Sequence, residues 1–456
     1  MQMYKRIRIL HSFAAGLLVV MVCCFAGCSK QPAKTESNHA EASSADAMLS
    51  SDSNAENSKL EENSTVSNLS SNDSASSDKQ AQASSHKTSV SSSVSSKATS
   101  SKQEQKPQVK QYYTSTVGLW YTVWWDSEGQ PYYDHHWTKE TRTTPARFGR
   151  YATDDTEKLK WDLNYFKKIG IDYLILDDTN NHQADGGNIA SHINACFKLA
   201  NSLGTSGTPK LCIAGGNPLL HNQADLMESE MSIFKGYATK YSNTYFQWKG
   251  KPLFVNFVLP QYFKYTNANF TIRNACGHTS EAKSAAESGK YNLNEQGLYG
   301  WVFDYEFKGA EAYGVNPGWS RSHNGLEIGK AEINRENGDL YRRLWLRALK
   351  AKPEMIVIAS WNDHAEETGI EAVNLSEDIA GREAEKKNPY LYEQMTEGYL
   401  ALKTGYVKGY YYKAENDSNI YQYTGSKLQK VSSVPEGGVL LWIPDDYYDW
   451  AGVARG

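Results

Sequence analysis

The chain has 456 residues, of which 22% are charged, and its formal net charge at pH 7 is -4. This balance excludes the basic footprint of a nucleic-acid-binding protein. Outside the first 28 residues the cysteines are Cys196, Cys212 and Cys276, an odd number with no Cys-x-x-Cys pair. That spacing argues against a disulfide scaffold and against a zinc cluster, so we predict three buried thiols.

Residues 1–28 have the pattern of a targeting signal. A basic head precedes an apolar stretch over 14–26, which is shorter than the roughly 20 residues needed to span a bilayer. The segment Phe25-Ala-Gly-Cys28 resembles the bacterial lipobox, in which the cysteine becomes lipidated. We therefore expect a bacterial lipoprotein anchored to a membrane through Cys28 and facing the cell exterior. The alternative is an ordinary cleaved signal in which Cys28 has no role.

Residues 29–110 are rich in Ser, Ala, Asn, Lys, Glu and Thr and contain few aliphatic residues. Such a segment cannot bury enough apolar surface to offset its conformational entropy. We predict a disordered linker that holds the following domain away from the membrane.

Beyond residue 110, strand-like and helix-like segments alternate. The predicted strands are 114–125, 171–176, 210–214, 251–258, 298–303 and one that begins at Met355. The predicted helices are 154–169, 189–203, 224–241, 330–350 and 389–404. This alternation indicates an α/β protein with a parallel sheet, and a (β/α)8 TIM-type barrel over 111–405 fits it best. Two further strands are expected to be irregular or to lie within 260–297.

From residue 406 to 456 the pattern changes to short apolar runs separated by turn signals such as Asn416-Asp417 and Thr424-Gly425. Runs of this kind are typical of β-hairpins. We expect a small C-terminal antiparallel β appendage.

The apolar run at 355–359 ends in a polar cluster that contains Asp363, Glu366 and Glu371. Active sites of α/β barrels lie at the carboxyl ends of the strands. Glycoside hydrolysis commonly uses two carboxyl groups, and Asp363 and Glu366 are candidates for that pair. An acidic loop exposed to solvent is the alternative.

Other candidate residues come from strand ends and from the loop after the first strand. Asp177 and Asp178 either hold sugar hydroxyls or form a turn, and His135 and His136 suggest a metal but lack a third ligand at a recognised spacing. We therefore predict no metal and place His136 in a loop lining a sugar cleft. The substrate-contacting candidates are Asp177, Asp178, Asp304, Tyr305, Trp124, His136, Trp361, Asn362 and His364.

The segment Asn362-Asp-His-Ala-Glu-Glu-Thr-Gly-Ile-Glu371 resembles a motif of the glycoside hydrolase family 99-like group, Asn-Glu-Trp-His-Glu-Gly-Thr-x-Ile-Glu. That group includes endo-α-mannosidases and related bacterial cell-surface proteins. The resemblance extends loosely over 111–405. It implies retaining hydrolysis through a sugar epoxide, with Asp363 assisting the substrate 2-hydroxyl and Glu366 as general acid/base. Asp363 replaces the family's Glu, and the shorter side chain displaces the carboxylate by about 1 Å, a shift that can cost ~10²-fold in rate.

These observations predict a cell-surface glycoside hydrolase that cleaves α-linked polysaccharide of the mannan or glucan type, as a monomer and without a cofactor. Whether the reaction retains or inverts configuration depends on the carboxyl separation, which is a three-dimensional quantity. The alternative is a non-catalytic glycan-binding lipoprotein on a degenerate barrel. An esterase has no support, since no Gly-x-Ser-x-Gly motif occurs.

Overall fold

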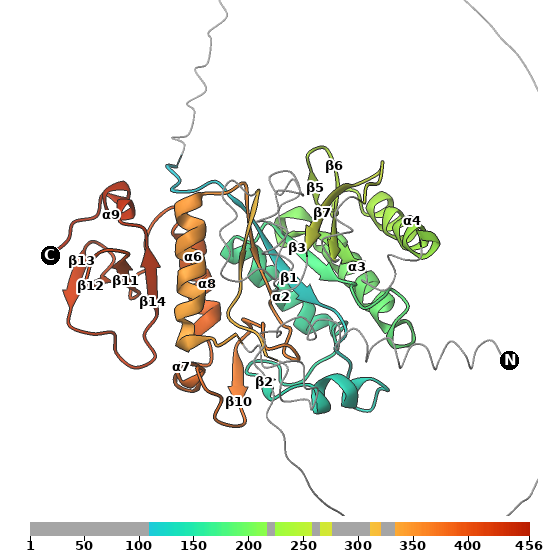
Figure 1. Cartoon of the computed structure of the whole chain (residues 1–456), viewed down its shortest axis with the longest axis horizontal. Helices are drawn as coiled ribbons and strands as arrows, with labels where there is room; N and C mark the ends of the chain where they lie inside the picture. The colour runs from blue at the N-terminus through green and yellow to red at the C-terminus, as the bar shows by residue number, and fades with distance from the viewer. Residues whose placement is uncertain (1–108, 217–223, 258–264, 276–310, 321–332) are drawn as a thin grey trace, which may run out of the picture. The chain divides into compact units, whose positions relative to one another are not determined.

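The structure is a computed structural model that describes residues 109–216, 224–257, 265–275, 311–320 and 333–456 (Figure 1). Several sequence predictions lie outside these residues: the signal with Cys28, the linker up to 108, the strand 298–303 with Asp304 and Tyr305, and Cys276. Within the described part of the chain, no helix is both long enough and apolar enough to cross a membrane.

The main sheet is parallel and has the first strand of the fold near its middle. Its parallel strands in spatial order are β8 (Ala312–Val315), β9 (Met355–Ile358), β1 (Thr116–Thr122), β3 (Tyr173–Asp177), β4 (Lys210–Gly215), β6 (Lys251–Phe257) and β7 (Thr271–Ala275). The short β5 (Gln247–Trp248) pairs antiparallel with the start of β6. β1 pairs with β3 on one side and with β9 on the other.

In a (β/α)8 barrel the first and last strands are neighbours, and here β1 pairs with β9. The strand order therefore matches that of such a barrel, with β7 and β8 at the two ends of the described sheet. Residues 276–310, which connect those two strands, are outside the description. The structure therefore shows a mixed α/β fold with a barrel-like parallel sheet, and the closed eight-stranded barrel stays a prediction.

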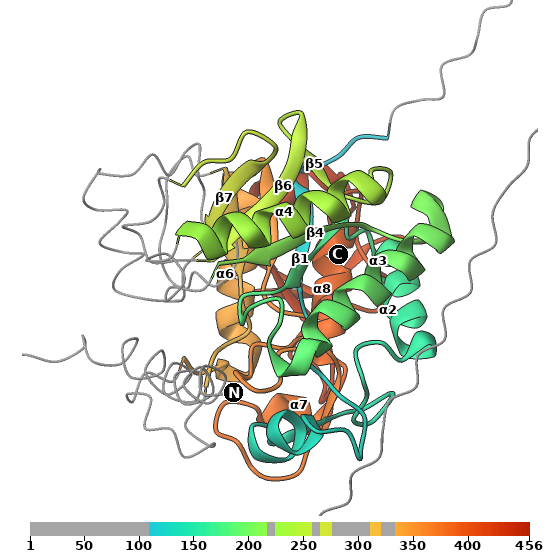
Figure 2. The ribbon, with the colours of Figure 1, turned by 90° about the vertical axis from the view of Figure 1, so that its right-hand side faces the viewer.

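Helices follow most of the described strands, as the sequence pattern predicts. They are α2 (Thr156–Ile169), α3 (Asn188–Gly207), α4 (Ala224–Lys240), α6 (Asp339–Ala351), α7 (Glu383–Lys387), α8 (Leu391–Ala401) and α9 (Asp446–Ala451). Figure 2 shows α3 and α4 lying along the same side of the sheet, beside β4 and β6. Phe234 of α4 stacks on Phe254 of β6 with ring centroids 5.5 Å apart.

Local chemistry explains the ends of α2. The Asp155 side chain accepts hydrogen bonds from the backbone N–H groups of Glu157 and Lys158, at 3.0 and 3.1 Å, which is an N-cap. Gly170 ends the helix with φ +98°, a left-handed conformation that glycine adopts without steric cost. The prediction of this helix from Asp155 to Gly170 is confirmed.

Other boundaries differ from the prediction. The helix expected over 330–350 begins only at Asp339, because Asn337 and Gly338 have positive φ angles of 54° and 93°. β7 falls within the range in which a missing strand was expected, whereas β8 was not recognised from the sequence.

The C-terminal segment forms a sheet of its own in the order β13 (Leu428–Val431), β12 (Ile420–Tyr423), β11 (Tyr411–Ala414), β14 (Leu440–Ile443). Two pairs are antiparallel, but β11 and β14 are parallel, because the chain crosses from β13 to the far side of β11. The purely antiparallel prediction is wrong at this pair. β14 packs against α6 and α8: Arg342 donates to the Leu440 carbonyl at 2.9 Å, and the Trp442 N–H donates to the Tyr399 hydroxyl at 3.1 Å (Figure 1).

Candidate active site

The loop after β9 is a compact turn built around Asp363. The Asp363 N–H donates to the Ser360 hydroxyl at 2.9 Å, and the Asp363 carbonyl accepts from the N–H groups of Thr368 and Gly369 at 3.1 and 3.0 Å. One carboxylate oxygen of Asp363 accepts from the Glu366 N–H at 2.8 Å. The two acids of the sequence motif therefore lie on one turn, with the backbone of the second held by the side chain of the first.

The two acids differ in exposure. Asp363 is buried, at 1% exposure, whereas Glu366 is partly exposed. The Glu366 carboxylate accepts a hydrogen bond from the Trp319 indole N–H at 3.1 Å, and the Ser320 N–H donates to the Glu366 carbonyl at 3.0 Å. The segment after β8 thus orients the acid that reaches toward solvent.

A third acid, Asp177, comes from the end of β3. It accepts hydrogen bonds from the Trp120 indole N–H at 2.8 Å and from the Thr179 hydroxyl and N–H at 2.8 and 3.1 Å. Burial raises the pKa of Asp177 despite these bonds, and the negative charge of Glu366 raises it further. This influence of Glu366 on Asp177 means that the carboxylates from the ends of β3 and β9 lie within electrostatic range of each other.

Asp178, the next residue, belongs to a neighbouring group of acids. Its carboxylate lies 2.7 Å from Nδ1 of His182, and burial raises the pKa of Asp178 to about 6. Glu230 of α4 lies close to it: burial, and then the charge of Asp178, raise the pKa of Glu230 to about 7. Buried acids with raised pKa values concentrate at functional sites. The sequence did not point to Glu230, because a single Glu on a helix carries no signal of burial.

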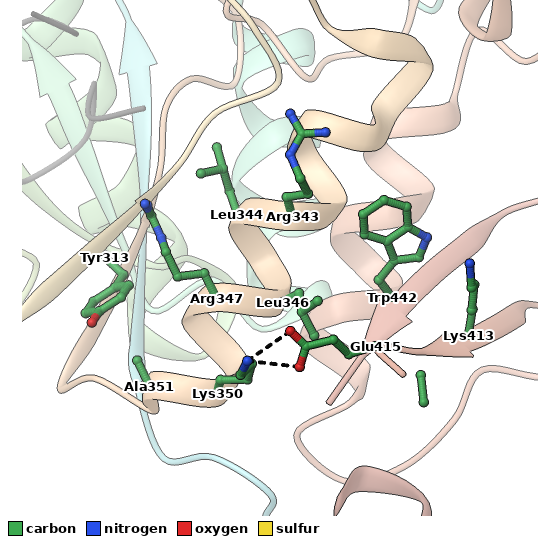
Figure 3. A pocket seen from close by; sticks show the side chains of 11 residues that line it. Tyr313, Arg343, Leu344, Leu346, Arg347, Lys350, Ala351, Lys413, Glu415 and Trp442 are labelled. Atoms are coloured by element: carbon green, nitrogen blue, oxygen red, sulfur yellow. Dashed lines mark hydrogen bonds and ion pairs between the residues drawn. The ribbon is translucent and has the colours of Figure 1, made fainter. Parts of the chain in front are cut away.

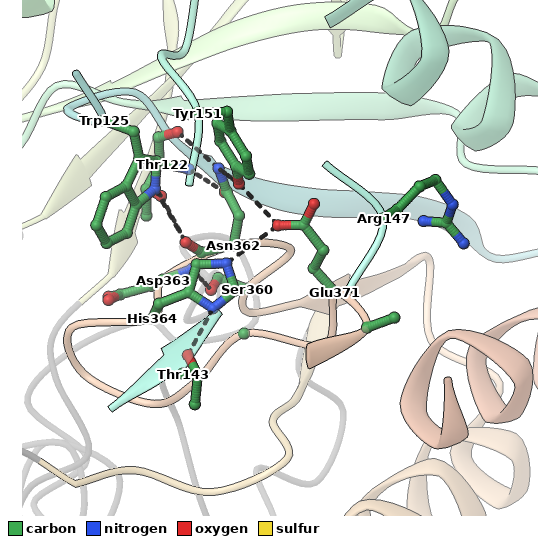
Figure 4. Close-up of polar contacts among 12 residues, drawn as sticks. Thr122, Trp125, Thr143, Arg147, Tyr151, Ser360, Asn362, Asp363, His364 and Glu371 are labelled. Carbon is green, nitrogen blue, oxygen red and sulfur yellow. Dashed lines mark hydrogen bonds and ion pairs between the residues drawn. The ribbon is translucent and has the colours of Figure 1, made fainter. Parts of the chain in front are cut away.

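Asn362, His364 and Glu371 lie beneath the turn and fix it to its neighbours (Figure 4). The Asn362 amide exchanges hydrogen bonds with the backbone of Thr122, at 2.9 and 3.1 Å, so the loop is joined to the end of β1. Nε2 of His364 lies 3.0 Å from the Glu371 carboxylate, which also accepts from the Tyr151 hydroxyl at 2.7 Å. Burial lowers the pKa of His364 in spite of the bond to Glu371. In Figure 4 the Asp363 side chain points away from this group, so Asn362 and His364 hold the turn on the side opposite to the Asp363 carboxylate.

A buried cation completes this support. Nζ of Lys158, which is fully buried on α2, lies 2.5 Å from Asp162 and 3.6 Å from Glu371. The same ammonium group lies 3.7 Å from the centre of the Tyr151 ring. Burial acts to raise the pKa of Glu371, but the charge of Lys158 and the contacts with His364 and Tyr151 together outweigh it and hold that pKa below the usual value.

The remaining predicted residues occupy two different environments. Trp361 is 1% exposed and packs edge-on against Phe166 of α2, with ring centroids 4.7 Å apart, which places it in the core. Trp124 lies 6.1 Å from His136 in the loop after β1. Both ring nitrogens of His136 face carboxylates, Glu140 at 3.1 Å and Asp185 at 3.0 Å. These bonds outweigh desolvation and raise the pKa of His136 to about 9.

Two hollows lie elsewhere on the described surface. One of about 710 Å³ lies between α6, β8 and the C-terminal sheet, and Figure 3 shows the residues that line it, among them Arg343, Arg347, Lys413 and Trp442. A second, of about 30 Å³, is bordered by Trp319 and Glu367. Neither is lined by Asp363 or Glu366, so the larger hollow and the acids are separate features.

No protein-family model matches this chain, and no curated protein sequence matches it. Among solved structures it is similar to the family 99 endo-α-mannosidase of Bacteroides thetaiotaomicron in complex with Bis-Tris-propane, with TM-score 0.47, 14% identity and coverage of 63% of this chain and 97% of that one. A second structure of the same enzyme gives TM-score 0.47 at 13% identity, with the same coverage. A glycoside hydrolase-like protein gives TM-score 0.40 at 13% identity, with 60% and 91% covered.

Proposed function

We propose that this protein is a glycoside hydrolase acting on α-linked polysaccharide of the mannan or glucan type. The observation that carries the proposal is the position of Glu366: partly exposed, bonded to the Trp319 indole, and within electrostatic range of Asp177. Carboxyl groups at the ends of β3 and β9, hydrogen-bonded to the indoles of Trp120 and Trp319, are the residue type and the place in the fold that glycoside hydrolysis on α/β barrels uses.

The different exposure of Glu366 and Asp363 assigns them different roles in the proposed reaction. Glu366 reaches toward solvent and acts as general acid, giving its proton to the departing glycosidic oxygen, and then as general base toward water. Asp363 lies on the same turn and, in line with the motif resemblance, assists attack by the substrate 2-hydroxyl, which leads to retention of configuration. Asp177 and Asp178 at the end of β3 bind sugar hydroxyls.

A glycan-binding protein without catalysis is the second candidate, and one observation favours it. Asp363 is 1% exposed, and its carboxylate accepts a hydrogen bond from the Glu366 N–H, a bond that a capping residue makes. In this reading the turn keeps its shape and the acids bind sugar without cleaving it.

We further propose that lipidated Cys28 anchors the protein to a membrane on the outer side of the cell, with residues 29–110 as a tether. Metabolic labelling with a palmitate analogue tests this independently: the Cys28→Ser variant is expected to lose the label and to leave the membrane fraction.

The test of hydrolysis measures reducing sugar released by the intact protein from a panel of α-mannans and α-glucans. Glu366→Gln is expected to lower turnover by ~10²-fold or more, since it removes general acid/base catalysis. Glu436→Gln, on the C-terminal side and exposed, makes the same charge change and serves as the control.

Unchanged turnover in Glu366→Gln would remove that residue from the mechanism. Saturable binding of a glycan with no sugar released by the wild-type protein at any pH would favour the binding protein instead.

A further inference from the structure

Three side chains in the loop after β1 bring metal-ligating atoms together. His135, His136 and Glu140 belong to the single-turn π-helix Asp134–Lys139 and its end, and their donor atoms all lie within 4.8 Å of one another. Nδ1 of His136 is 3.1 Å from one oxygen of Glu140, and Nε2 of His135 is 3.6 Å from the other. The Glu140 carboxylate thus faces both imidazoles, one oxygen toward each.

The separations of 3.1 and 3.6 Å between the two imidazole nitrogens and the Glu140 oxygens suit a small tetrahedral ion. With Zn–N and Zn–O bonds of about 2.0–2.1 Å, neighbouring ligand atoms of a tetrahedral site lie about 3.3 Å apart. Two imidazoles and one carboxylate form a set that zinc takes when the fourth position holds water. The His135 side chain is 56% exposed, so the site opens to solvent on that side.

A residue from another loop supplies the support that such a site needs. Asp185, between β3 and α3, accepts from Nε2 of His136 at 3.0 Å. Zinc-bound histidines commonly donate their second ring N–H to a carboxylate, which fixes the tautomer and directs the other nitrogen at the metal. Here the bond to Asp185 leaves Nδ1 of His136 directed at Glu140, where the ion would sit.

We propose that His135, His136 and Glu140 bind a divalent zinc-class ion, with Asp185 orienting His136. The sequence did not point to Glu140 as a third ligand, because Glu140 follows His136 at a spacing of four within a π-turn and not in a recognised motif. An ion at this position joins the loop after β1 to the loop after β3. The ring centres of Trp124 and Trp125 lie 6.1 and 6.2 Å from that of His136, so an ion bound to His136 would also hold these two side chains in place. The inference is independent of any hydrolytic activity.

The competing explanation is a set of ion pairs between His136 and two acids, with no metal. Ion pairs give His135 no necessary role, whereas a metal site requires it as a ligand. His135→Ala therefore separates the two explanations, and its exposure makes it a substitution that the fold tolerates.

The experiment uses the intact protein, stripped with a chelator, and titrates Zn²⁺ against a chromophoric chelator. The wild-type protein is expected to take up a high-affinity equivalent of Zn²⁺ that His135→Ala and Glu140→Gln each weaken at least tenfold. Asp185→Asn is expected to weaken it about 10- to 100-fold, the usual effect of losing such a support. Glu128→Gln, exposed in the same loop, has the same charge change as Glu140→Gln and is expected to bind as the wild type does.

Co²⁺ provides a second readout through its visible absorption bands, which are intense in tetrahedral sites. Zn²⁺ is also expected to raise the melting temperature of the wild-type protein but not that of Glu140→Gln, because only a ligand bound to the folded state stabilises it. The proposal is overturned if no high-affinity uptake occurs, or if uptake is the same in His135→Ala and Glu140→Gln as in the wild type.

Discussion

Replacing Lys158 by methionine tests the buried charge group that supports the candidate active-site turn. Lys158 and Asp162 are both fully buried, and the Glu371 side chain is 1% exposed. With an effective dielectric constant of about 20, the contacts at 2.5 and 3.6 Å correspond to gross attractions of about 7 and about 5 kcal/mol. Most of this attraction offsets the desolvation of the three charges.

The variant loses the attraction but keeps two acids in the core. Removing one partner of a buried ion pair typically costs about 3–5 kcal/mol, and that is the loss of unfolding free energy expected for Lys158→Met. A loss of this size is a large part of the stability of an ordinary domain, about 5–15 kcal/mol. The double variant Lys158→Met/Asp162→Asn is expected to recover part of it, because one of the two uncompensated charges is gone.

The pKa of Asp162 determines how the stability of the Lys158→Met variant changes with pH. Burial raises the pKa of Asp162 from 3.8 to about 7, even though the charge of Lys158 lowers it. Without Lys158 that pKa rises further, so the native carboxyl keeps its proton to higher pH. An acid whose folded pKa is raised makes the protein lose stability as pH rises toward that pKa, so the deficit of the variant relative to the wild type grows as pH rises above about 7.

Urea denaturation followed by tryptophan fluorescence measures the free energy of unfolding at each pH. Lys160→Met, on an exposed position of the same helix, is the control and should change stability by no more than about 0.5 kcal/mol. A loss below about 1 kcal/mol for Lys158→Met, or a loss independent of pH, would refute this account of the cluster.

Three further predictions concern stability and are checked by the same denaturation measurement. Gly118→Ala is expected to destabilise by about 1–3 kcal/mol, because its methyl group would lie 2.6 Å from the hydroxyl oxygen of the buried Tyr173; wild-type stability would show that this ring can move. Asp155→Ala removes the N-cap of α2 and should cost about 1 kcal/mol, a loss that Asp155→Asn should largely avoid. Glu230→Gln should reduce the fall in stability between about pH 4.5 and pH 7 by about 1–3 kcal/mol, since the raised pKa of Glu230 makes its ionisation unfavourable in the folded state; an unchanged fall would place its pKa near the ordinary value.

The strands that could be predicted are those whose own residues form a continuous apolar run, the pattern of a strand buried on both faces. The apolar run Met355–Ile358 and the segment that contains Tyr173–Asp177 are buried on both faces, and both were located from sequence. β8 has only four residues, one of them Gly314, and lacks any apolar run that marks a strand. Its position depends on the ladder it forms with β9, which is a property of the assembled sheet.

The residues of the candidate site also fall into two groups, those that the local sequence marks and those whose surroundings only the folded chain determines. Asp363 and Glu366 could be singled out because they follow a strand in a motif. Glu230 could not, because its significance depends on side chains that another element brings to it. Glu140 could not, because its approach to His136 depends on the π-helical geometry of the turn. The parallel pairing of β11 with β14 was missed for a related reason: hairpin patterns say which segments are strands but not on which side a later strand returns.

The position of β1 between β3 and β9 also affects how the chain folds during its synthesis. Its ladder with β3 can form early, but the opposite edge stays without its native partner until the segment around Met355 has been synthesised. Unpaired strand edges invite association with other chains, and contacts between distant segments form slowly. During that interval the unpaired edge of β1 needs protection, so the emerging chain should be a client of holding chaperones until β9 has been synthesised.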